Sequence, residues 1–240
     1  MPEINSYEDV DLKASMYVRV TSAPENFLAG WREGDAQAVA LSRASGNFIY
    51  FSKPSTPAFY ARTVMAATSK LGEIKEITVH PALAEKLNPK AVFPWIWMSK
   101  FDQVLPDFSH LNLEIVSDAK LNNQIHAFIV RSGFEAHFLP GHPEIEFWAV
   151  AWNGDRTAIE AVAAGSRRIS GERVLNTVLV APSLRGRGLG KAITAAATAE
   201  IQRLGSSVVH LGVKGTNVQA MRVYESLGFE ITDELASLEL

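Results

Sequence analysis

The chain has 240 residues, a length that fits one large domain or two small ones. Its hydrophobic content of 47%, charged content of 20% and net charge of -3 are those of a soluble globular protein, and they give no basic footprint for a nucleic acid partner. The absence of cysteine excludes disulfides, thiolate catalysis and cysteine-based metal sites.

The first 110 residues are predicted to form an α/β region. The polar start of the chain lacks an apolar signal segment, and no apolar run reaches about 18 residues, so we expect a cytoplasmic protein with no membrane partner. Residues 33–43 and 57–71 look helical, whereas residues 48–51 and 74–79 look like strands. The alternating aromatic residues of 93–98 fit either an acceptor pocket or, more simply, one buried face of a strand.

Part of this region repeats the order of a later segment. Residues 49–72 read as strand, loop, helix and Leu-Gly, and residues 179–205 read the same way. The first loop, residues 52–57, has two prolines and no glycine, and proline lacks the N–H group that a phosphate needs. The region is therefore either a degenerate, non-binding copy of the later unit or an unrelated α/β extension.

Residues 111–240 are predicted to form a second α/β domain. A strand at 113–116 and a helix at 119–132 precede a loop rich in proline and glycine. Strands at 147–152, 158–169 and 174–180 follow, with an Asn153-Gly154 hairpin signal and a turn at Gly171. A meander followed by strand, helix, strand and helix is typical of an α/β arrangement with a mixed sheet.

A basic, glycine-rich loop follows the last strand of the meander. A helix N-terminus carries unpaired N–H groups and partial positive charge, and glycines let the backbone close around an anion. The sequence therefore predicts a phosphate site formed by Arg185, Gly186, Arg187, Gly188, Leu189, Gly190 and Lys191.

The spacing of the glycines in this loop limits which phosphate-containing ligands it can bind. Ala192 stands where an ATP or GTP loop needs a hydroxyl, and glycines spaced by two do not form the dinucleotide pattern. What remains is Arg-x-x-Gly-x-Gly, for which the simplest alternative is a glycine-rich surface turn.

A second motif lies about thirty residues further along. Asn217 can cap a helix that ends near Gly228, and Asn217, Ala220 and Tyr224 share one helical face. The simplest alternative is an ordinary capped helix with Tyr224 in the core.

Together the two motifs resemble the GNAT N-acetyltransferase superfamily. The resemblance implies a GNAT-like acyl-CoA N-acyltransferase fold over residues 111–240, in tandem if the first half is a degenerate copy, with acetyl-CoA as co-substrate. It also implies roles for particular residues: the Arg185–Lys191 loop holds the pyrophosphate, Asn217 contacts the cofactor and Tyr224 lies by the acetyl sulfur. The backbone of Val178, Leu179 and Val180 would pair with the pantetheine arm.

The predicted reaction is acetyl transfer to a primary amine, with Tyr224 as general acid. A phenol has a pKa of about 10, so it is protonated at pH 7 and can give its proton to a thiolate. The base is less clear because no acid lies on residues 174–178. Glu146, Glu160, His137 and His142 are candidates, and a water chain is the alternative.

Several functional questions stay open at this point. The two loop histidines lack further ligands, so we expect no metal. The acceptor is a small amine or a peptide N-terminus, and whether the chain forms a homodimer is not indicated. A non-catalytic protein that binds acyl-CoA for a regulatory role is the alternative function.

Overall fold

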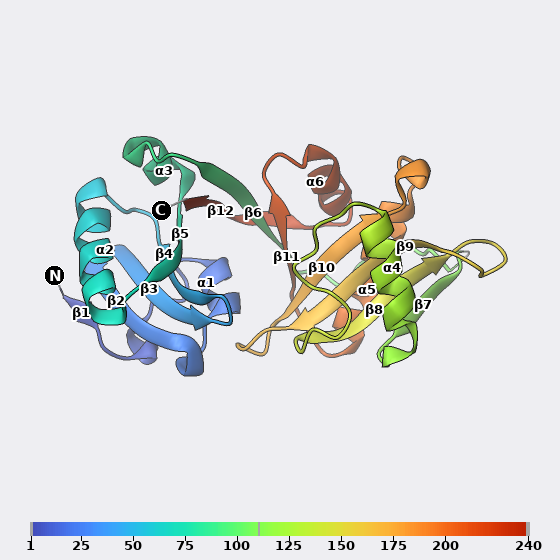
Figure 1. The fold of residues 1–240 in the computed structure, drawn as a ribbon, viewed down its shortest axis with the longest axis horizontal. Coiled ribbons are helices and arrows are strands. Elements are labelled where there is room, and N and C mark those ends of the chain that lie inside the picture. The colour runs from blue at the N-terminus through green and yellow to red at the C-terminus, as the bar shows by residue number, and fades with distance from the viewer. Residues whose placement is uncertain (1, 110, 239–240) are drawn as a thin grey trace. The chain divides into compact units, whose positions relative to one another are not determined.

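The computed structural model describes residues 2–109 and 111–238 and has the expected mixed α/β architecture (Figure 1). The chain divides into two compact units. Unit 1 is drawn from Met1–Trp97, Lys214–Thr216 and Ile231–Leu240, and unit 2 from Met98–Val213 and Asn217–Glu230. The C-terminal segment thus belongs to unit 1, whereas the sequence predicted one boundary at residue 110.

Unit 1 is a mixed sheet with a long helix on one face. Its strands are ordered β1-β2-β3-β4-β5-β12-β6, with β4 and β5 parallel and β5 and β12 antiparallel. The strands are β1 (Glu3–Ile4), β2 (Phe27–Glu33), β3 (Ala36–Arg43), β4 (Gly46–Phe51), β5 (Ile74–Val79), β6 (Val92–Lys100) and β12 (Glu230–Leu238). The helices are α1 (Met16–Thr21), α2 (Pro57–Leu71) and α3 (Pro81–Leu87).

The helix α2 spans the residues 57–71 that the sequence predicts as helical. The Thr56 hydroxyl caps the helix by accepting a hydrogen bond from Phe59 N, and Pro57 occupies the first turn, where its missing N–H costs nothing. Its buried residues Phe59 and Ala67 join Ile49 and Phe51 of β4 in one apolar cluster. This packing gives unit 1 a core of its own.

The prediction of a helix at residues 33–43 is wrong. These residues form the end of β2, a turn at Gly34 and Asp35, and β3, with Glu33 paired to Ala36. Gly34 has a φ of 57°, which a two-residue hairpin turn requires. The alanine-rich run has high helix propensity, but β3 lies inside the sheet, where burial on both faces outweighs propensity.

Unit 2 carries the second predicted domain. From the end of β6 its strand order is β6-β11-β10-β9-β8-β7, with β10 and β11 parallel and the β7-β8-β9-β10 meander antiparallel. The strands are β7 (Leu113–Val116), β8 (Ile145–Trp152), β9 (Ile159–Arg167), β10 (Arg173–Val180) and β11 (Val209–Lys214). The helices are α4 (Asn122–Arg131), α5 (Leu189–Arg203) and α6 (Val218–Glu225).

The sheet of unit 2 has an α4 face and an α5 face. Ile125, Phe128 and Ile129 of α4 pack in one cluster with Ala164 of β9 and Leu179 of β10. Val180 is the next residue along β10, so its side chain points the other way, and it lies 3.7 Å from the position of a Cβ on Gly190 of α5. The α6 helix packs against α5.

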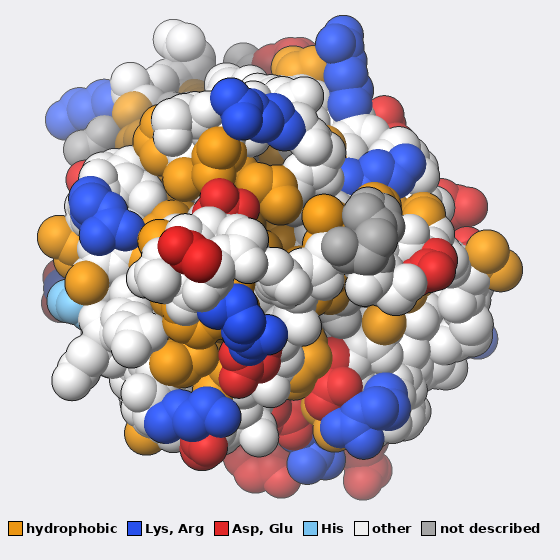
Figure 2. Space-filling model, turned by 90° about the vertical axis from the view of Figure 1, so that its right-hand side faces the viewer, with side chains coloured by type: hydrophobic (Ala, Val, Ile, Leu, Met, Phe, Trp, Pro, Cys, Tyr) orange, Lys and Arg blue, Asp and Glu red, His pale blue; other side chains and the backbone are white. Residues whose placement is uncertain are grey.

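The surface of the protein mixes both signs of charge on the side that Figure 2 shows, where acidic and basic side chains are interspersed among apolar ones. Within the described residues, no helix has both the length and the apolar character needed to cross a membrane.

Candidate active site

Strands β10 and β11 stop pairing soon after they begin. Val174 pairs with His210 and Leu175 with Leu211, and the described chain shows no further register pair between these strands. The register of β10 with β9 shifts between Asn176 and Leu179, and Thr177 takes a φ of 48°. A positive φ is rare for a β-branched residue, and bulges of this kind occur next to active sites. We call residues 176–180 the splayed edge of β10.

The predicted pantetheine-binding residues lie on this splayed edge. Leu179 is buried in the α4 cluster, whereas Val178 and Val180 are half-buried. A strand without a neighbour on one side offers N–H and C=O groups to an extended ligand. The location is therefore suited to the role that the resemblance implies for Val178, Leu179 and Val180.

The glycine-rich loop forms an open cradle at the start of α5. Gly186 and Gly188 have φ values of 79° and 83°, and a Cβ on either would meet no atom within 4 Å. Gly188 is the N-cap and supplies no side-chain hydrogen bond, and the first helical bond runs from Ala192 N to Gly188 O. The amides of residues 189–191 therefore have no partner within the helix and can bind an anion.

Three cations border this cradle. Arg185 and Arg187 are exposed and Lys191 is half-buried. No ion pair to any of them occurs in the part of the chain that the structure describes, and each side chain can turn toward a bound phosphate. The loop thus combines free amides, open space and unpaired positive charge, and it fits a pyrophosphate group.

The two candidate site residues of the second motif, Asn217 and Tyr224, belong to α6 and its N-cap. Asn217 caps the helix, because its Oδ1 accepts a hydrogen bond from Ala220 N at 3.1 Å. Tyr224 is 7% exposed and packs against Phe229 with ring centroids 6.0 Å apart. Its hydroxyl forms no hydrogen bond to another described residue, and burial raises the pKa of Tyr224 to about 12. The phenol is protonated at neutral pH and has a proton to donate.

The two carboxylates predicted as bases lie at opposite ends of the meander. Glu146 is held by Arg173, whose Nε and Nη2 donate over 2.6 and 3.2 Å. Glu160 lies at the loop end of β9, where its carbonyl accepts a hydrogen bond from Ala181 N. Glu160 is four positions from Ala164, the partner of Asn176, which is about 13 Å along a strand.

The predicted loop histidines show no ligand set. His142 Nδ1 accepts a hydrogen bond from Glu144 N at 3.2 Å, and its ring packs on Phe138. His137 is exposed. Among residues 2–109 and 111–238, no group of three or more metal-ligating side chains is close enough to hold an ion.

Sequence reasoning missed Asn176 and Ser166. Asn176 Nδ2 donates to Ser166 Oγ at 2.6 Å and to Val174 O at 3.2 Å. The one available signal was the pair of polar residues Asn176 and Thr177 in the middle of a largely apolar strand.

Comparison with known proteins agrees with these features. Residues 93–229, more than half of the chain, match the Acetyltransferase (GNAT) family. Mycothiol acetyltransferase of Nocardiopsis dassonvillei is 38% identical over 96 residues, covering 38% of this chain and 29% of that protein. Mycothiol acetyltransferase of Renibacterium salmoninarum is 40% identical over 73 residues, covering 30% and 21%. The chain thus spans less than a third of the length of these curated relatives.

Solved structures share the fold over nearly the whole chain. A GNAT-family acetyltransferase from Colwellia psychrerythraea has a TM-score of 0.56 at 14% identity, covering 100% of this chain and 98% of that one. A putative GNAT-family acetyltransferase from Novosphingobium aromaticivorans has a TM-score of 0.54 at 20% identity, covering 95% and 92%. At these identities the likeness concerns the fold.

Proposed function

Because the chain belongs to the GNAT acetyltransferase family, we propose that it transfers the acetyl group of acetyl-CoA to a primary amine by direct attack. The observation that carries the proposal is the splayed edge of β10, which leads directly into the open amide cradle at the start of α5. A strand edge suits an extended pantetheine arm, and a helix N-terminus with nearby cations suits a pyrophosphate.

Different residues of unit 2 bind different parts of acetyl-CoA in this proposal. The amides of 189–191 hold the pyrophosphate, with Arg185, Arg187 and Lys191 supplying charge. The backbone of Val178, Leu179 and Val180 holds the arm, and an N–H group of this edge polarises the thioester carbonyl. Asn217 contacts the cofactor from the start of α6.

Tyr224 acts as the general acid in this proposal. Burial raises its pKa to about 12, so it enters the reaction protonated. The C–N bond forms as the C–S bond breaks, the sulfur takes the tyrosine proton, and the tyrosine recovers a proton from solvent. A positioned general acid of this kind contributes about 10²–10⁴-fold to the rate.

Unit 1 is proposed to be a degenerate copy that binds no cofactor. It has the same order of parallel strand, helix and parallel strand, in β4, α2 and β5. However, β4 and β5 pair at four positions, with a register shift between Asn47 and Phe48, and they remain paired up to Tyr50 and Thr78, near the end of β4. The start of α2 is capped by Thr56 and carries Pro57, so it offers fewer free amides than α5.

The acceptor is proposed to be a small amine or a peptide N-terminus. Two of the relatives are named mycothiol acetyltransferase. The amines that are tested as acceptors should therefore include one of the mycothiol type. Since Glu146 is held by Arg173 and Glu160 lies about 13 Å along β9 from the partner of Asn176, water near the Asn176 end of the splayed edge takes the proton of the amine.

The proposal is tested by following free thiol while the protein is incubated with acetyl-CoA and a panel of amines. Thiol release that depends on both substrates is expected. Acetyl-CoA binding without thiol release on any amine would instead favour the non-catalytic function.

A further inference from the structure

Asn176 is a half-buried polar side chain at the first position of the splayed edge. It pairs with Ala164 of β9, and Ala164 belongs to the cluster that α4 covers. Residues paired across neighbouring strands point to the same face of a sheet. Asn176 therefore faces the α4 side, whereas α6, which carries Tyr224, packs against α5 on the other side.

The orientation of the Asn176 amide is fixed by its hydrogen bonds. The Val174 carbonyl can only accept, so the group 3.2 Å from it is the NH₂ of Asn176, which also donates to Ser166 Oγ at 2.6 Å. Both N–H donors are thereby used. The carbonyl Oδ1 is the remaining hydrogen-bonding group, and it has no partner among the described residues.

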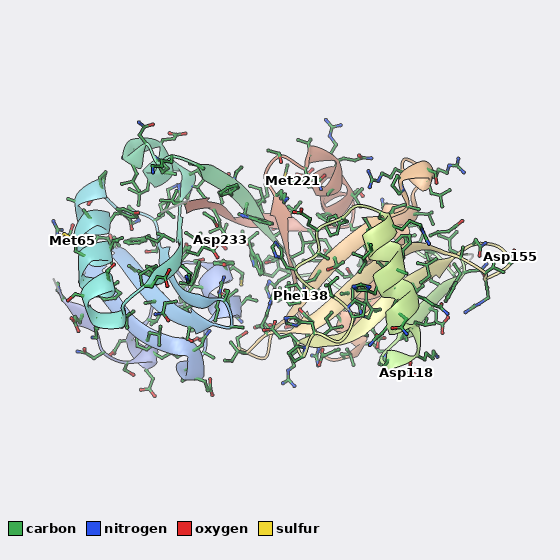
Figure 3. The ribbon with its side chains drawn as sticks, in the orientation of Figure 1. Met65, Asp118, Phe138, Asp155, Met221 and Asp233 are labelled. Carbon is green, nitrogen blue, oxygen red and sulfur yellow. The ribbon has the colours of Figure 1, made fainter. Side chains whose placement is uncertain are left out.

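A loop contacts Thr177, the residue that follows Asn176. Thr177 Oγ1 donates to the Phe138 carbonyl at 3.1 Å and so ties the loop of residues 132–144 to the bulge of β10. Figure 3 labels Phe138 in this loop. Phe138 stacks under the Arg168 guanidinium, whose carbon lies 4.7 Å from the ring centroid. Phe134 and Leu139 leave apolar surface exposed along the loop.

Ionisable groups of β11 and of the loop at residues 132–144 are engaged with other side chains. His210, which pairs with Val174, is 1% exposed, with Nδ1 2.8 Å from Ser99 Oγ and Nε2 3.8 Å from the Glu172 carboxylate. The Arg168 guanidinium forms an ion pair with the Glu144 carboxylate at 2.7 Å. The backbone N–H of Glu144 donates a hydrogen bond to His142 Nδ1. Within the described chain, no carboxylate forms a hydrogen bond with Asn176.

We infer that Asn176 Oδ1 accepts an N–H of the incoming amine, and that this uncharged site selects amines of low pKa. The inference rests on the proposed function. An amine held from the α4 face keeps its lone pair free for the thioester carbon, while Tyr224 acts from the α5 face.

The selectivity follows from what an amide can do. A carbonyl oxygen holds an N–H but does not remove a proton at neutral pH, so the free-amine fraction depends on the pKa of the amine itself. A peptide α-amine has a pKa of about 7.7–8.0 and a lysine side chain about 10.4, a difference of about 300-fold in the free form at pH 7. The acceptor class is therefore an amine of the α-amino type.

The test compares two classes of amine with wild type, Asn176→Ala and Asn176→Asp. Peptide α-amines and amino sugars form the low-pKa class, and lysine side chains and alkyl diamines form the high-pKa class. For wild type, kcat/KM by thiol release is expected to favour the fastest low-pKa amine by about 100-fold or more at pH 7. Asn176→Ala should raise the KM for that amine about tenfold and leave the KM for acetyl-CoA within about twofold.

Asn176→Asp should narrow the preference at least about tenfold, because a carboxylate accepts the proton of a high-pKa amine. The matched control is Asn47→Ala in β4 of unit 1, which also removes an amide bonded to a backbone carbonyl, that of Leu71. It should leave both KM values unchanged. Equal use of the two classes by wild type, or an unchanged amine KM in Asn176→Ala, overturns the inference while leaving the proposed function in place. Absence of thiol release on every amine overturns the proposed function itself, and the inference with it.

Discussion

Leu175 of β10 pairs with Leu211 of β11, and it is the last residue of β10 to do so in the described chain. In unit 1, the corresponding parallel strands remain paired up to Tyr50 and Thr78. The same order of strand, helix and strand thus leaves more of the strand edge unpaired in unit 2 than in unit 1. Since unpaired backbone groups need partners, this difference is the structural reason to place a ligand in unit 2.

Replacing Tyr224 with Phe should lower kcat by about 100-fold or more, because the leaving thiolate loses its proton donor. The KM for acetyl-CoA should change little, since the ring remains. Thiol release under saturating substrates measures the effect. Tyr60→Phe, which alters another tyrosine whose pKa burial raises, serves as the control and should keep full activity. Turnover of Tyr224→Phe within a few-fold of wild type would remove Tyr224 from the mechanism.

The pH dependence of the reaction should show no loss of the acid below pH 10. Burial holds the pKa of Tyr224 at about 12, so kcat/KM should rise as the amine loses its proton and then stay level. A decrease of kcat/KM that begins near pH 8 in wild type and is absent in Tyr224→Phe would contradict the assignment of a pKa of about 12 to Tyr224.

The same pKa shift affects stability at high pH. Because the folded pKa lies above the unfolded value, the contribution to stability is complete below about pH 10 and is lost as the pH rises toward 12. Urea titrations at pH 9 and 11 should therefore show a smaller loss of stability for Tyr224→Phe than for wild type. An equal loss in both proteins would argue against a buried, neutral phenol.

Two glycines of α5 offer a matched pair for the cradle. Gly188 begins the helix with a φ of 83° and Gly205 follows it with a φ of 93°, and a Cβ at either meets nothing within 4 Å. Alanine at either position should cost about 1–2 kcal/mol of stability, because both need a left-handed backbone. Only Gly188→Ala should also weaken acetyl-CoA binding, by about tenfold, as measured by calorimetry. Equal weakening by Gly205→Ala would mean that the effect is global.

Local patterns in the sequence were enough to predict most of unit 2. The Pro182 boundary, the glycine-rich turn and the Asn217 cap each act on their own neighbours, so the strand, loop and helix around them could be read directly. The family and the mixed α/β fold follow from the same residues. Tyr224 was singled out because its position matches the GNAT motif and helical spacing places it on the face of Asn217, and its role as the acid stays a prediction.

Features that depend on distant residues could not be read in the same way. The run at 36–43 looks helical until neighbours on both sides make it a central strand. The pairing of β12 with β5 joins residues more than 150 positions apart, such as Ala236 with Val79. The role proposed for Asn176 depends on the bulge at Thr177, and a positive φ at threonine has no sequence signal.

The role of β12 in unit 1 predicts different effects for two changes on one strand. Ala236 is 1% exposed within the core of unit 1, whereas Ile231 is 48% exposed. Ala236→Asp should cost several kcal/mol by burying a carboxylate, and it should speed amide exchange in β5. Ile231→Asp should change neither. Unaltered exchange in β5 of a folded Ala236→Asp protein would show that β12 does not hold unit 1 together.

The central claim is that one acetyl-CoA binds per chain, in the cradle and splayed edge of unit 2. A calorimetric titration of the protein with acetyl-CoA tests it most directly, with an Arg185→Glu, Arg187→Glu double variant beside wild type. The account predicts a stoichiometry of about one per chain and at least about tenfold weaker binding in the variant, since two cations that neutralise the pyrophosphate become anions. Two sites per chain, no binding to wild type, or unchanged binding to the variant would contradict it.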